Sequence, residues 1–468
     1  MGLSRRHGRY RPVVGGAAVT APGIIVGDNK PSHDAWLQQC MAAYAIDDAS
    51  VEVNFRELVP NIRPGRERAT HLIHPYPAKL LAAIPYLFLR CPTIAPAGSR
   101  ILDPFCGSGT VLLEAALAGH QADGADANPL ARIIAGAKLG LIEPARLTAS
   151  LEALIVAADE EASPPDVVNI HHWYHEDVIV RLAALRAAIT SLRDKEVRRF
   201  FEVCLSVCAR KVSLADPRLS VPVKINPDRV SIYGAKGAEV VRRIDALTGD
   251  QVVPIFRAIA EQNIERMAKL CDAAPAVVPP VISDDARRID ARDGTYDLII
   301  TSPPYVGAQK YVRSSSLGLG WLGLTPGGRL RHLERLNIGR EHYGLREYAE
   351  AQATGCPAAE AVIAAVRKKN RLRAHIASNY LIEMRAAFAE MARVTRAGGH
   401  LVLISGQNLI CGQCFDTPAY LEELASGLGF STRARFVDNI RSRGLMTKRN
   451  RTAGIISQEV ITVMQLNA

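Results

Sequence analysis

Residues 296–305 read Tyr296-Asp297-Leu298-Ile299-Ile300-Thr301-Ser302-Pro303-Pro304-Tyr305. The apolar run predicts a buried parallel strand, and the two prolines end it because neither can donate to a ladder of hydrogen bonds. The stiff loop that follows lies at the carboxyl end of a strand, where open α/β sheets bind ligands. The Tyr305 ring, the Ser302 oxygen and the Pro303 carbonyl suit a planar substrate that bears an amino group. Taken alone, the stretch is equally consistent with a strand that ends in a simple turn.

A second stretch, far upstream, predicts a site for a nucleoside. It reads Ile101-Leu102-Asp103-Pro104-Phe105-Cys106-Gly107-Ser108-Gly109-Thr110 and has the pattern of a strand, a glycine turn and a helix. Gly107 and Gly109 let the backbone approach a ligand closely. No Gly-Lys-Ser/Thr follows, which excludes a Walker loop, and the third glycine of the dinucleotide pattern is missing.

Acids end the next two predicted strands. Asp126 ends a short strand about 20 residues after the glycine turn, where an acid hydrogen-bonds ribose hydroxyls. Asp285 ends a third strand that begins near Val281, and it could accept a hydrogen bond from an adenine amino group. A single acid at a strand end is more often a cap. The glycine turn and both acids, in this order and ahead of the Pro-Pro loop, favour a cofactor that contains adenosine.

These stretches resemble the amino-methylating DNA methyltransferases that use S-adenosylmethionine. Residues 103–109 match the cofactor loop of that family, and residues 302–305 match its catalytic loop. The form Thr-Ser-Pro-Pro-Tyr resembles the cytosine-N4 branch. Residues 74–79, His-Pro-Tyr-Pro-Ala-Lys, are similar to the segment before the cofactor loop in that branch, near the methionine end of the cofactor. Residues 393–404 resemble the helix, turn and strand that follow the catalytic loop.

The resemblance implies a role for each matching residue. The residues expected to bind S-adenosylmethionine are Lys79, Asp103, Phe105, Gly107 and Gly109 of the matched segments, together with the strand-end acids Asp126 and Asp285. The residues that the resemblance assigns to catalysis are Ser302, Pro303, Pro304 and Tyr305. Ser302 and the Pro303 carbonyl would orient an exocyclic amine, and Tyr305 would stack on the flipped base. This chemistry needs no metal, and the Pro-Cys dipeptide of C5-cytosine enzymes is absent from the sequence.

Strands that alternate with helices predict an α/β fold, a doubly wound seven-stranded Rossmann-like methyltransferase sheet with a mainly helical insertion. About 140 residues separate the second and third predicted strands, far more than a loop needs. The predicted parts are a basic flexible N-terminal region (1–60), a first part of the methyltransferase domain with the cofactor loop (61–144), the helical insertion (145–280), and a second part with the catalytic loop (281–468), which carries a basic insertion at about 325–375. The helical insertion reads DNA or only supports the sheet, and we favour the first.

Composition bounds the partners. The chain has 57 Lys and Arg against 47 Asp and Glu, a net charge of +10, which favours a polyanionic partner. The 9 Cys show no repeated metal spacing, and the histidines of residues 171–175 lack a cysteine or acid to complete a ligand set. No apolar run approaches the ~18 residues of a membrane span. We therefore expect a cytoplasmic protein with reduced thiols, no bound metal and no membrane partner. Together with the resemblance, the charge favours double-stranded DNA as the substrate. A cognate restriction enzyme is a possible further partner.

Several alternatives stay open at this stage. Adenine N6 is one, because Ser in place of Asp in the catalytic loop only tilts the choice of base. Enzymes that methylate guanine N2 in transfer RNA carry Asp-Pro-Pro-Tyr and a larger upstream domain, and glutamine-N5 methyltransferases favour Asn-Pro-Pro-Tyr. A DNA-binding protein without activity would be expected to have a broken cofactor loop or to lack the aromatic residue. The sequence leaves the oligomeric state open.

Overall fold

The computed structural model describes residues 19–20, 32–59, 68–224, 230–274, 276–307, 311–439 and 458–467. Apart from residues 19–20, the basic segment predicted to be mobile, residues 1–30, lies outside this range. Residues 32–59, which the sequence prediction included in the flexible N-terminal region, are instead folded against the sheet: the Trp36 ring stacks on Phe436 with ring centroids 5.2 Å apart.

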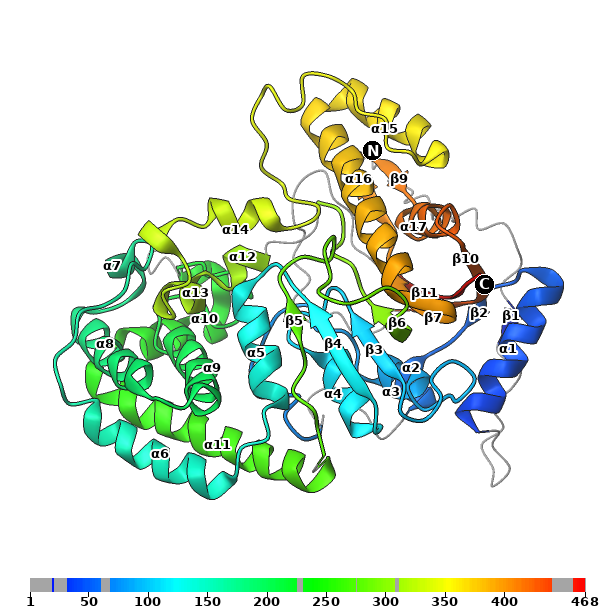
Figure 1. Cartoon of the computed structure of the whole chain (residues 1–468). Coiled ribbons are helices and arrows are strands. Elements are labelled where there is room, and N and C mark those ends of the chain that lie inside the picture. Colours follow the sequence, from blue (N-terminus) through cyan, green and yellow to red (C-terminus); the bar gives the residue numbers. More distant parts are fainter. Residues whose placement is uncertain are drawn as a thin grey trace.

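The described strands form one sheet in the order β1-β2-β10-β11-β7-β6-β3-β4-β5 (Figure 1). All neighbours are parallel except β11, which runs antiparallel to both β7 and β10. The strands are β1 (Val19–Thr20), β2 (Val51–Glu52), β3 (Arg100–Asp103), β4 (Gln121–Ala125), β5 (Ile282–Ser283), β6 (Tyr296–Thr301), β7 (Thr395–Ser405), β10 (Phe430–Asn439) and β11 (Gln458–Leu466). A separate hairpin pairs β8 (Asn408–Ile410) with β9 (Gln413–Phe415).

The doubly wound Rossmann-like methyltransferase fold predicted from the sequence is confirmed. The seven predicted strands form the part of the sheet from β5 to β10. The chain builds β3, β4 and β5 outward in one direction, returns to place β6 beside β3, and then adds β7, β10 and β11 in the other direction. The sheet has nine strands rather than seven, because β1 and β2 extend it beside β10. Each of these two strands is two residues long, too short for a period-two pattern to reveal it.

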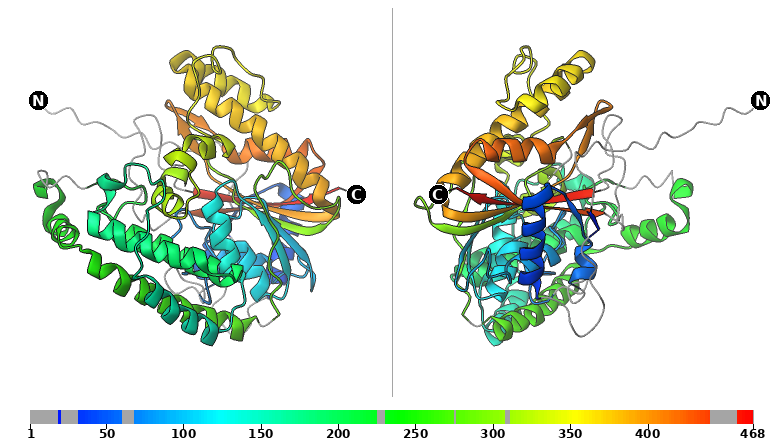
Figure 2. Two further views of the ribbon diagram at one scale, coloured as in Figure 1. Left: turned by 60° about the vertical axis from the view of Figure 1, so that its left-hand side comes forward. Right: turned by 90° about the vertical axis from the view of Figure 1, so that its right-hand side faces the viewer.

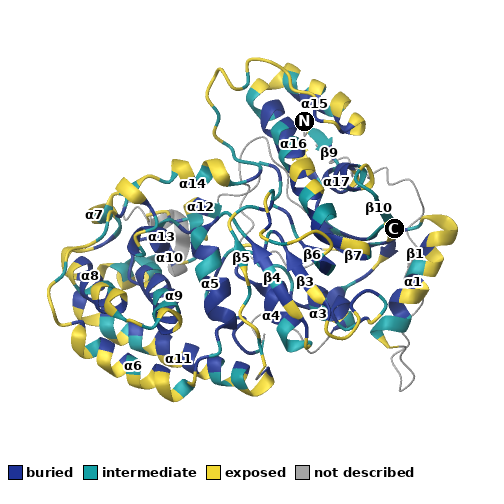
Figure 3. Cartoon of the chain, in the orientation of Figure 1, coloured by how far each residue is buried: buried dark blue, intermediate teal, exposed yellow. Residues whose placement is uncertain are grey.

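Alternating side chains of the central strands face two cores. Leu298 and Ile300 of β6 pack with α1 (His33–Asp47), α2 (Phe55–Leu58), α3 (Ala83–Phe88) and α4 (Thr110–Leu117). Ile299 packs on the other face with α15 (Pro357–Lys369), α16 (Arg371–Val394) and α17 (Thr417–Ser426). Figure 3 shows the strands as the dark-blue layer between these helices. The apolar run at residues 296–300 therefore supplies both cores, as expected for a strand buried on both faces.

Between β4 and β5 the chain leaves the sheet and forms helices. After α5 (Pro129–Leu139) come α6 (Pro144–Ala157), α7 (Ile170–Trp173), α8 (Glu176–Ser191), α9 (Lys195–Lys211), α10 (Val230–Asp245) and α11 (Val252–Ala273). Figures 1 and 2 show these helices gathered at one side of the sheet. Helix α5 contributes to two cores: Ala135 and Leu139 pack toward the sheet, while Leu130 and Ile134 pack with α6, α8, α9 and α11.

The second part of the chain carries short helices beyond the catalytic loop. These are α12 (Tyr311–Ser314), α13 (Ser316–Trp321) and α14 (Arg331–Leu336), and they precede α15 and α16. For Trp321 the sequence favours core packing over a place beside a flipped base. Its side chain is fully buried and meets the Tyr174 ring edge-on, so it is a core residue. In the described part of the chain, no helix combines the length and apolar character needed to cross a bilayer.

Candidate active site

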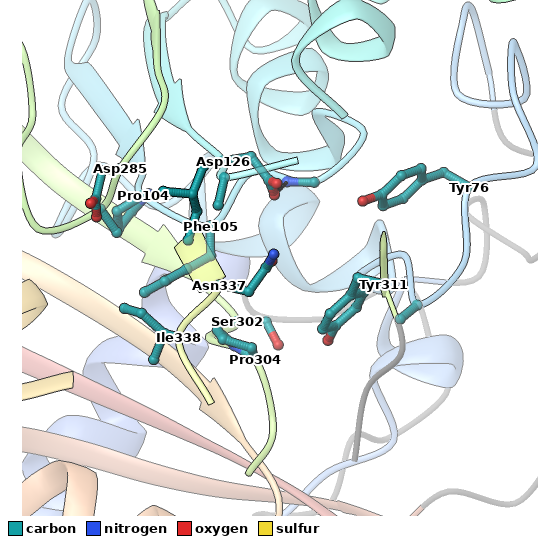
Figure 4. A pocket seen from close by; sticks show the side chains of 15 residues that line it. Tyr76, Pro104, Phe105, Asp126, Asp285, Ser302, Pro304, Tyr311, Asn337 and Ile338 are labelled. Atoms are coloured by element: carbon teal, nitrogen blue, oxygen red, sulfur yellow. Dashed lines mark hydrogen bonds between the residues drawn. The ribbon is translucent and has the colours of Figure 1, made fainter. Parts of the chain in front are cut away.

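Two adjoining cavities open at the carboxyl ends of β6, β3, β4 and β5. The inner cavity encloses about 640 Å³, including its open mouth, and fifteen residues line it (Figure 4). They are Tyr76, Ala78, Pro104, Phe105, Gly107, Asp126, Ala127, Asp285, Ala286, Ser302, Pro304, Tyr311, Leu336, Asn337 and Ile338. Four neighbouring parallel strands thus deliver their following loops to one place, as the sheet topology requires.

The glycine loop is fastened to β4 by Asp126. One carboxylate oxygen accepts from the Gly107 N–H at 2.9 Å, and the other accepts from the Asn128 N–H at 2.8 Å. Gly107 has a φ of +49°, in the left-handed region that glycine tolerates, and it faces Tyr76, whose Cε1 would lie 3.7 Å from an added Cβ. Burial raises the pKa of Asp126 to about 6. The carboxylate both shapes the loop and borders the cavity.

Asp285, the second acid predicted to end a strand, borders the inner cavity at the end opposite Tyr76 (Figure 4). Its two carboxylate oxygens accept from the Arg287 guanidinium at 2.8 and 2.9 Å. The same guanidinium reaches Glu383 of α16 at 3.2 Å and donates to the Leu336 carbonyl at 3.2 Å. Asp285 therefore borders the cavity while fixing, through Arg287, the end of α14, a second task that the sequence pattern did not indicate.

Asp103, Gly109 and Lys79 do not line either cavity, although the resemblance assigned all three to the cofactor. Asp103 is buried and accepts from the Thr301 hydroxyl at 2.7 Å and from the Phe105 N–H at 3.1 Å. It joins the ends of β3 and β6. An added Cβ on Gly109 would lie 3.0 Å from the Ala135 Cβ, so this glycine permits α4 to pack on α5. Lys79 donates to the His71 carbonyl at 2.9 Å.

Asp103 gives a prediction about pH. Burial raises its pKa from 3.8 to about 7, so between these values the folded protein binds more protons than the unfolded chain, and stability falls as pH rises. We expect the free energy of unfolding of the wild type, relative to that of Asp103→Asn, to drop by up to about 4 kcal/mol from pH 4 to pH 8. Denaturant titrations at several pH values measure this. The exposed Asp284→Asn is the control, and parallel curves for wild type and Asp103→Asn would contradict the assignment.

The loop of residues 302–305 divides its residues between the two cavities. Ser302 and Pro304 border the inner cavity. Pro304 and Tyr305 border the outer cavity of about 670 Å³, which is also lined by Tyr311, Val312, Arg313, Glu334, Asn337, Ile338, Gly339, Arg340, Glu341 and His342. The Tyr305 hydroxyl donates to Glu459 of β11 at 3.4 Å. Pro303 is buried and lines neither cavity. The two cavities meet at Pro304, Tyr311, Asn337 and Ile338.

Asn128 connects the segments around the inner cavity, and the sequence analysis did not select it as a site residue. Its amide nitrogen donates to the Tyr76 hydroxyl at 3.0 Å and to the Ser315 hydroxyl at 3.1 Å. Its amide oxygen accepts from the Leu130 N–H and caps α5. The Asn-Pro pair after an acid is a recognisable helix start, but it gives no hint of the contacts with Tyr76 and Ser315.

Other described side chains make contacts that bear on roles suggested by the sequence. Cys106 is buried and burial raises the pKa of its thiol, which agrees with a packing role in the glycine loop. From the sequence, Arg63, Arg66 and Arg68 of the polar linker could contact the DNA backbone, although a solvated loop is the commoner arrangement. Arg68 donates to the buried Glu114 at 2.7 Å. Arg63 and Arg66 lie outside the described residues. Within the described residues, no group of three His, Cys, Asp or Glu is arranged to hold a metal ion.

Comparisons with known proteins point to methyltransferases. Residues 74–161 match the family model described as UPF0020, an RMKL-like methyltransferase domain. The type II methyltransferase M.MvaI of Kocuria varians is 20% identical over 444 residues, which cover 90% of this chain and 96% of that protein. The type II methyltransferase M.BsoBI of Geobacillus stearothermophilus is 21% identical over 388 residues, 71% of this chain and 73% of that protein.

Among solved structures, the rRNA methyltransferase AviRa of Streptomyces viridochromogenes superimposes with a TM-score of 0.29 at 11% identity, over 86% of this chain and 96% of that one. The fold assignment rests on the strand order of this chain and not on that superposition. The family match begins at the segment that carries Tyr76 and includes the glycine loop and Asp126, so it spans much of the inner cavity's wall. The family match and the two type II methyltransferases support S-adenosylmethionine as the cofactor.

Proposed function

We propose that the protein is a DNA methyltransferase that moves the methyl group of S-adenosylmethionine to the exocyclic amine of a flipped base, cytosine N4. The observation that carries the proposal is the junction of the two cavities at the Ser-Pro-Pro-Tyr loop, because a methyl donor and an acceptor base must meet at one point. The similarity to two type II methyltransferases over most of their lengths supports DNA as the substrate. Cytosine rests on the serine form of the loop.

In the proposal, S-adenosylmethionine lies along the inner cavity. Asp285 and Tyr76 border opposite ends of the cavity, and Asp126 lies between them (Figure 4). In the proposed arrangement Asp285 takes the adenine, Asp126 the ribose hydroxyls, and the segment around Tyr76 the methionine end. Phe105 borders the same cavity and offers an aromatic surface for the base of the cofactor.

The outer cavity would receive the flipped base. Tyr305 and Tyr311 border it, and an aromatic ring can stack on any base that leaves the duplex. An exocyclic amine is a poor nucleophile because its lone pair is delocalised into the ring. A hydrogen bond from the amine to Ser302, which borders the inner cavity, would hold the nitrogen pyramidal and aim the lone pair toward that cavity. The Pro303 carbonyl is the second acceptor that the resemblance implies, but Pro303 is buried and lines neither cavity, so the proposal does not depend on it. S-adenosylmethionine supplies the electrophilic methyl group, and orientation provides most of the rate enhancement.

Identification of the product tests the proposal. Purified protein is incubated with unmethylated genomic DNA and S-adenosylmethionine, the DNA is digested to nucleosides, and the modified nucleoside is identified by mass. We expect N4-methylcytosine. A parallel incubation without S-adenosylmethionine shows the background. N6-methyladenine would overturn the choice of base and leave the class of enzyme intact. Methylation of transfer RNA in place of DNA would overturn the substrate.

A further inference from the structure

Residues 311–337, which we call the α12–α14 arm, form part of the wall of both cavities. Tyr311 and Asn337, the two ends of the arm, border both. In Figure 1, α12 and α14 lie above α5 and α13, beside the sheet strands. The arm carries four arginines but only one acid, Glu334. It therefore brings a net positive charge to the proposed site of base flipping.

All four arginines of the arm are exposed. They are Arg313, Arg329, Arg331 and Arg335. Arg313 borders the outer cavity. Within the described residues, none of the four has an ion pair or a hydrogen bond from its side chain. Four exposed guanidinium groups on one arm, one of them bordering the outer cavity, are therefore available to an anionic partner.

Helix α14 directs two of these arginines outward. Leu333 is buried in the core shared with the helical insertion. In an α-helix of 3.6 residues per turn, Arg331 and Arg335 lie one turn apart on the face opposite Leu333. Their positions are thus fixed by the packing of Leu333, and their charged groups project from the same face of the helix.

A second basic cluster, formed by Arg367, Lys369 and Arg373 near the start of α16, makes contacts within the chain. Arg367 donates to the carbonyls of Ala349 and Glu350 at 2.7 and 3.1 Å. Lys369 donates to the Cys411 carbonyl at 3.1 Å, and Arg373 lies 3.6 Å from Glu341. These cations hold α15 and α16 to neighbouring segments. By sequence both clusters are equally good candidates for DNA contact, whereas their contacts within the chain distinguish them.

We propose that the arginines of the α12–α14 arm bind the phosphates of duplex DNA on either side of the flipped nucleotide. The inference rests on the proposed function and adds the surface that grips the substrate. A base that leaves the duplex remains attached to its backbone, so the flanking phosphates stay at the mouth of the pocket. Contacts with phosphates position the duplex without reading its sequence.

Salt dependence of binding measures such contacts. Each phosphate that a cation neutralises contributes about 0.9 to the slope of log K against log salt concentration on duplex DNA. The probe is a fluorescein-labelled duplex of random sequence, titrated by anisotropy between about 50 and 200 mM NaCl in the presence of S-adenosylhomocysteine. For the double variant Arg331→Gln/Arg335→Gln we expect the line of log K against log salt concentration to become less steep, by about 2 in its slope. The affinity for S-adenosylhomocysteine should stay unchanged.

Two further variants make the test specific. Arg331→Lys/Arg335→Lys keeps both charges and should retain the slope of the parent. Arg100→Gln/Arg396→Gln removes two exposed cations at the amino ends of β3 and β7, the edge of the sheet opposite the cavities, and its slope should also match the parent. An unchanged slope for the arm variant, or an equal fall for the variant at the opposite edge, would overturn the inference while leaving the proposed function standing. A parent protein that binds no duplex DNA would overturn both.

Discussion

Replacing Tyr305 by alanine will lower kcat/KM for duplex DNA by about 100-fold and leave the dissociation constant of S-adenosylmethionine within about twofold, because loss of one base–aromatic stack costs about 1–3 kcal/mol. Tyr305 borders the outer cavity and not the inner one, which separates the two effects. The loss should fall on the step that holds the flipped base. Steady-state kinetics with a methylation assay and calorimetry with the cofactor measure the two quantities.

Tyr305→Phe is the matched control. It keeps the ring and removes only the hydroxyl, whose hydrogen bond to Glu459 is long at 3.4 Å. We expect this variant to retain most of the activity. Equal loss of activity in both variants would show that the hydroxyl and Glu459, and not the ring, carry the role. Loss of cofactor binding in Tyr305→Ala would show that the loop serves the inner cavity instead.

Replacing Asp126 by alanine will raise the dissociation constant of S-adenosylmethionine by about 100-fold, since hydrogen bonds to a charged group contribute about 1.5–3 kcal/mol each. The change removes the proposed acceptor for the ribose hydroxyls and also releases the Gly107 and Asn128 N–H groups. Calorimetric titration with the cofactor measures the effect. The exposed Asp284→Ala, a carboxylate lost beside Asp285, should bind as the wild type does. Unchanged affinity in Asp126→Ala would remove this residue from the ribose role.

The same carboxylate sets a pH dependence. Burial raises the pKa of Asp126 to about 6, so its charge is present above that pH and is lost as pH falls through it. Protonation takes away the negative charge and one acceptor position. Cofactor affinity of the wild type should therefore weaken below about pH 6, while Asp126→Asn, which cannot ionise, should show a flatter profile. A wild-type affinity that is constant from pH 5 to pH 8 would contradict this role.

Elements whose conformation depends on neighbouring residues in the chain could be predicted from the sequence. The apolar run at residues 296–300, the two prolines and the glycine loop each determine their own conformation, and from these patterns alone β6, β3 and α4 could be placed along the chain. Leu336, Asn337 and Ile338 were not found, because they reach the cavities through the packing of α14 and no pattern marks them. The motif also pointed to Asp103 as a site residue, but it did not show that the Asp103 carboxylate accepts a hydrogen bond from the Thr301 hydroxyl and lines neither cavity.

Helix α5 also bears on how the molecule unfolds. Its Ala135 and Leu139 are part of the sheet's core, and its Leu130 and Ile134 are part of the core of the insertion. Separating the insertion from the sheet would expose one of these faces to water, at about 25 cal/mol for each Å² of apolar surface. The two regions are therefore joined as one cooperative unit, and amide hydrogens of α9 should become better protected from exchange when a ligand fills the inner cavity some distance away.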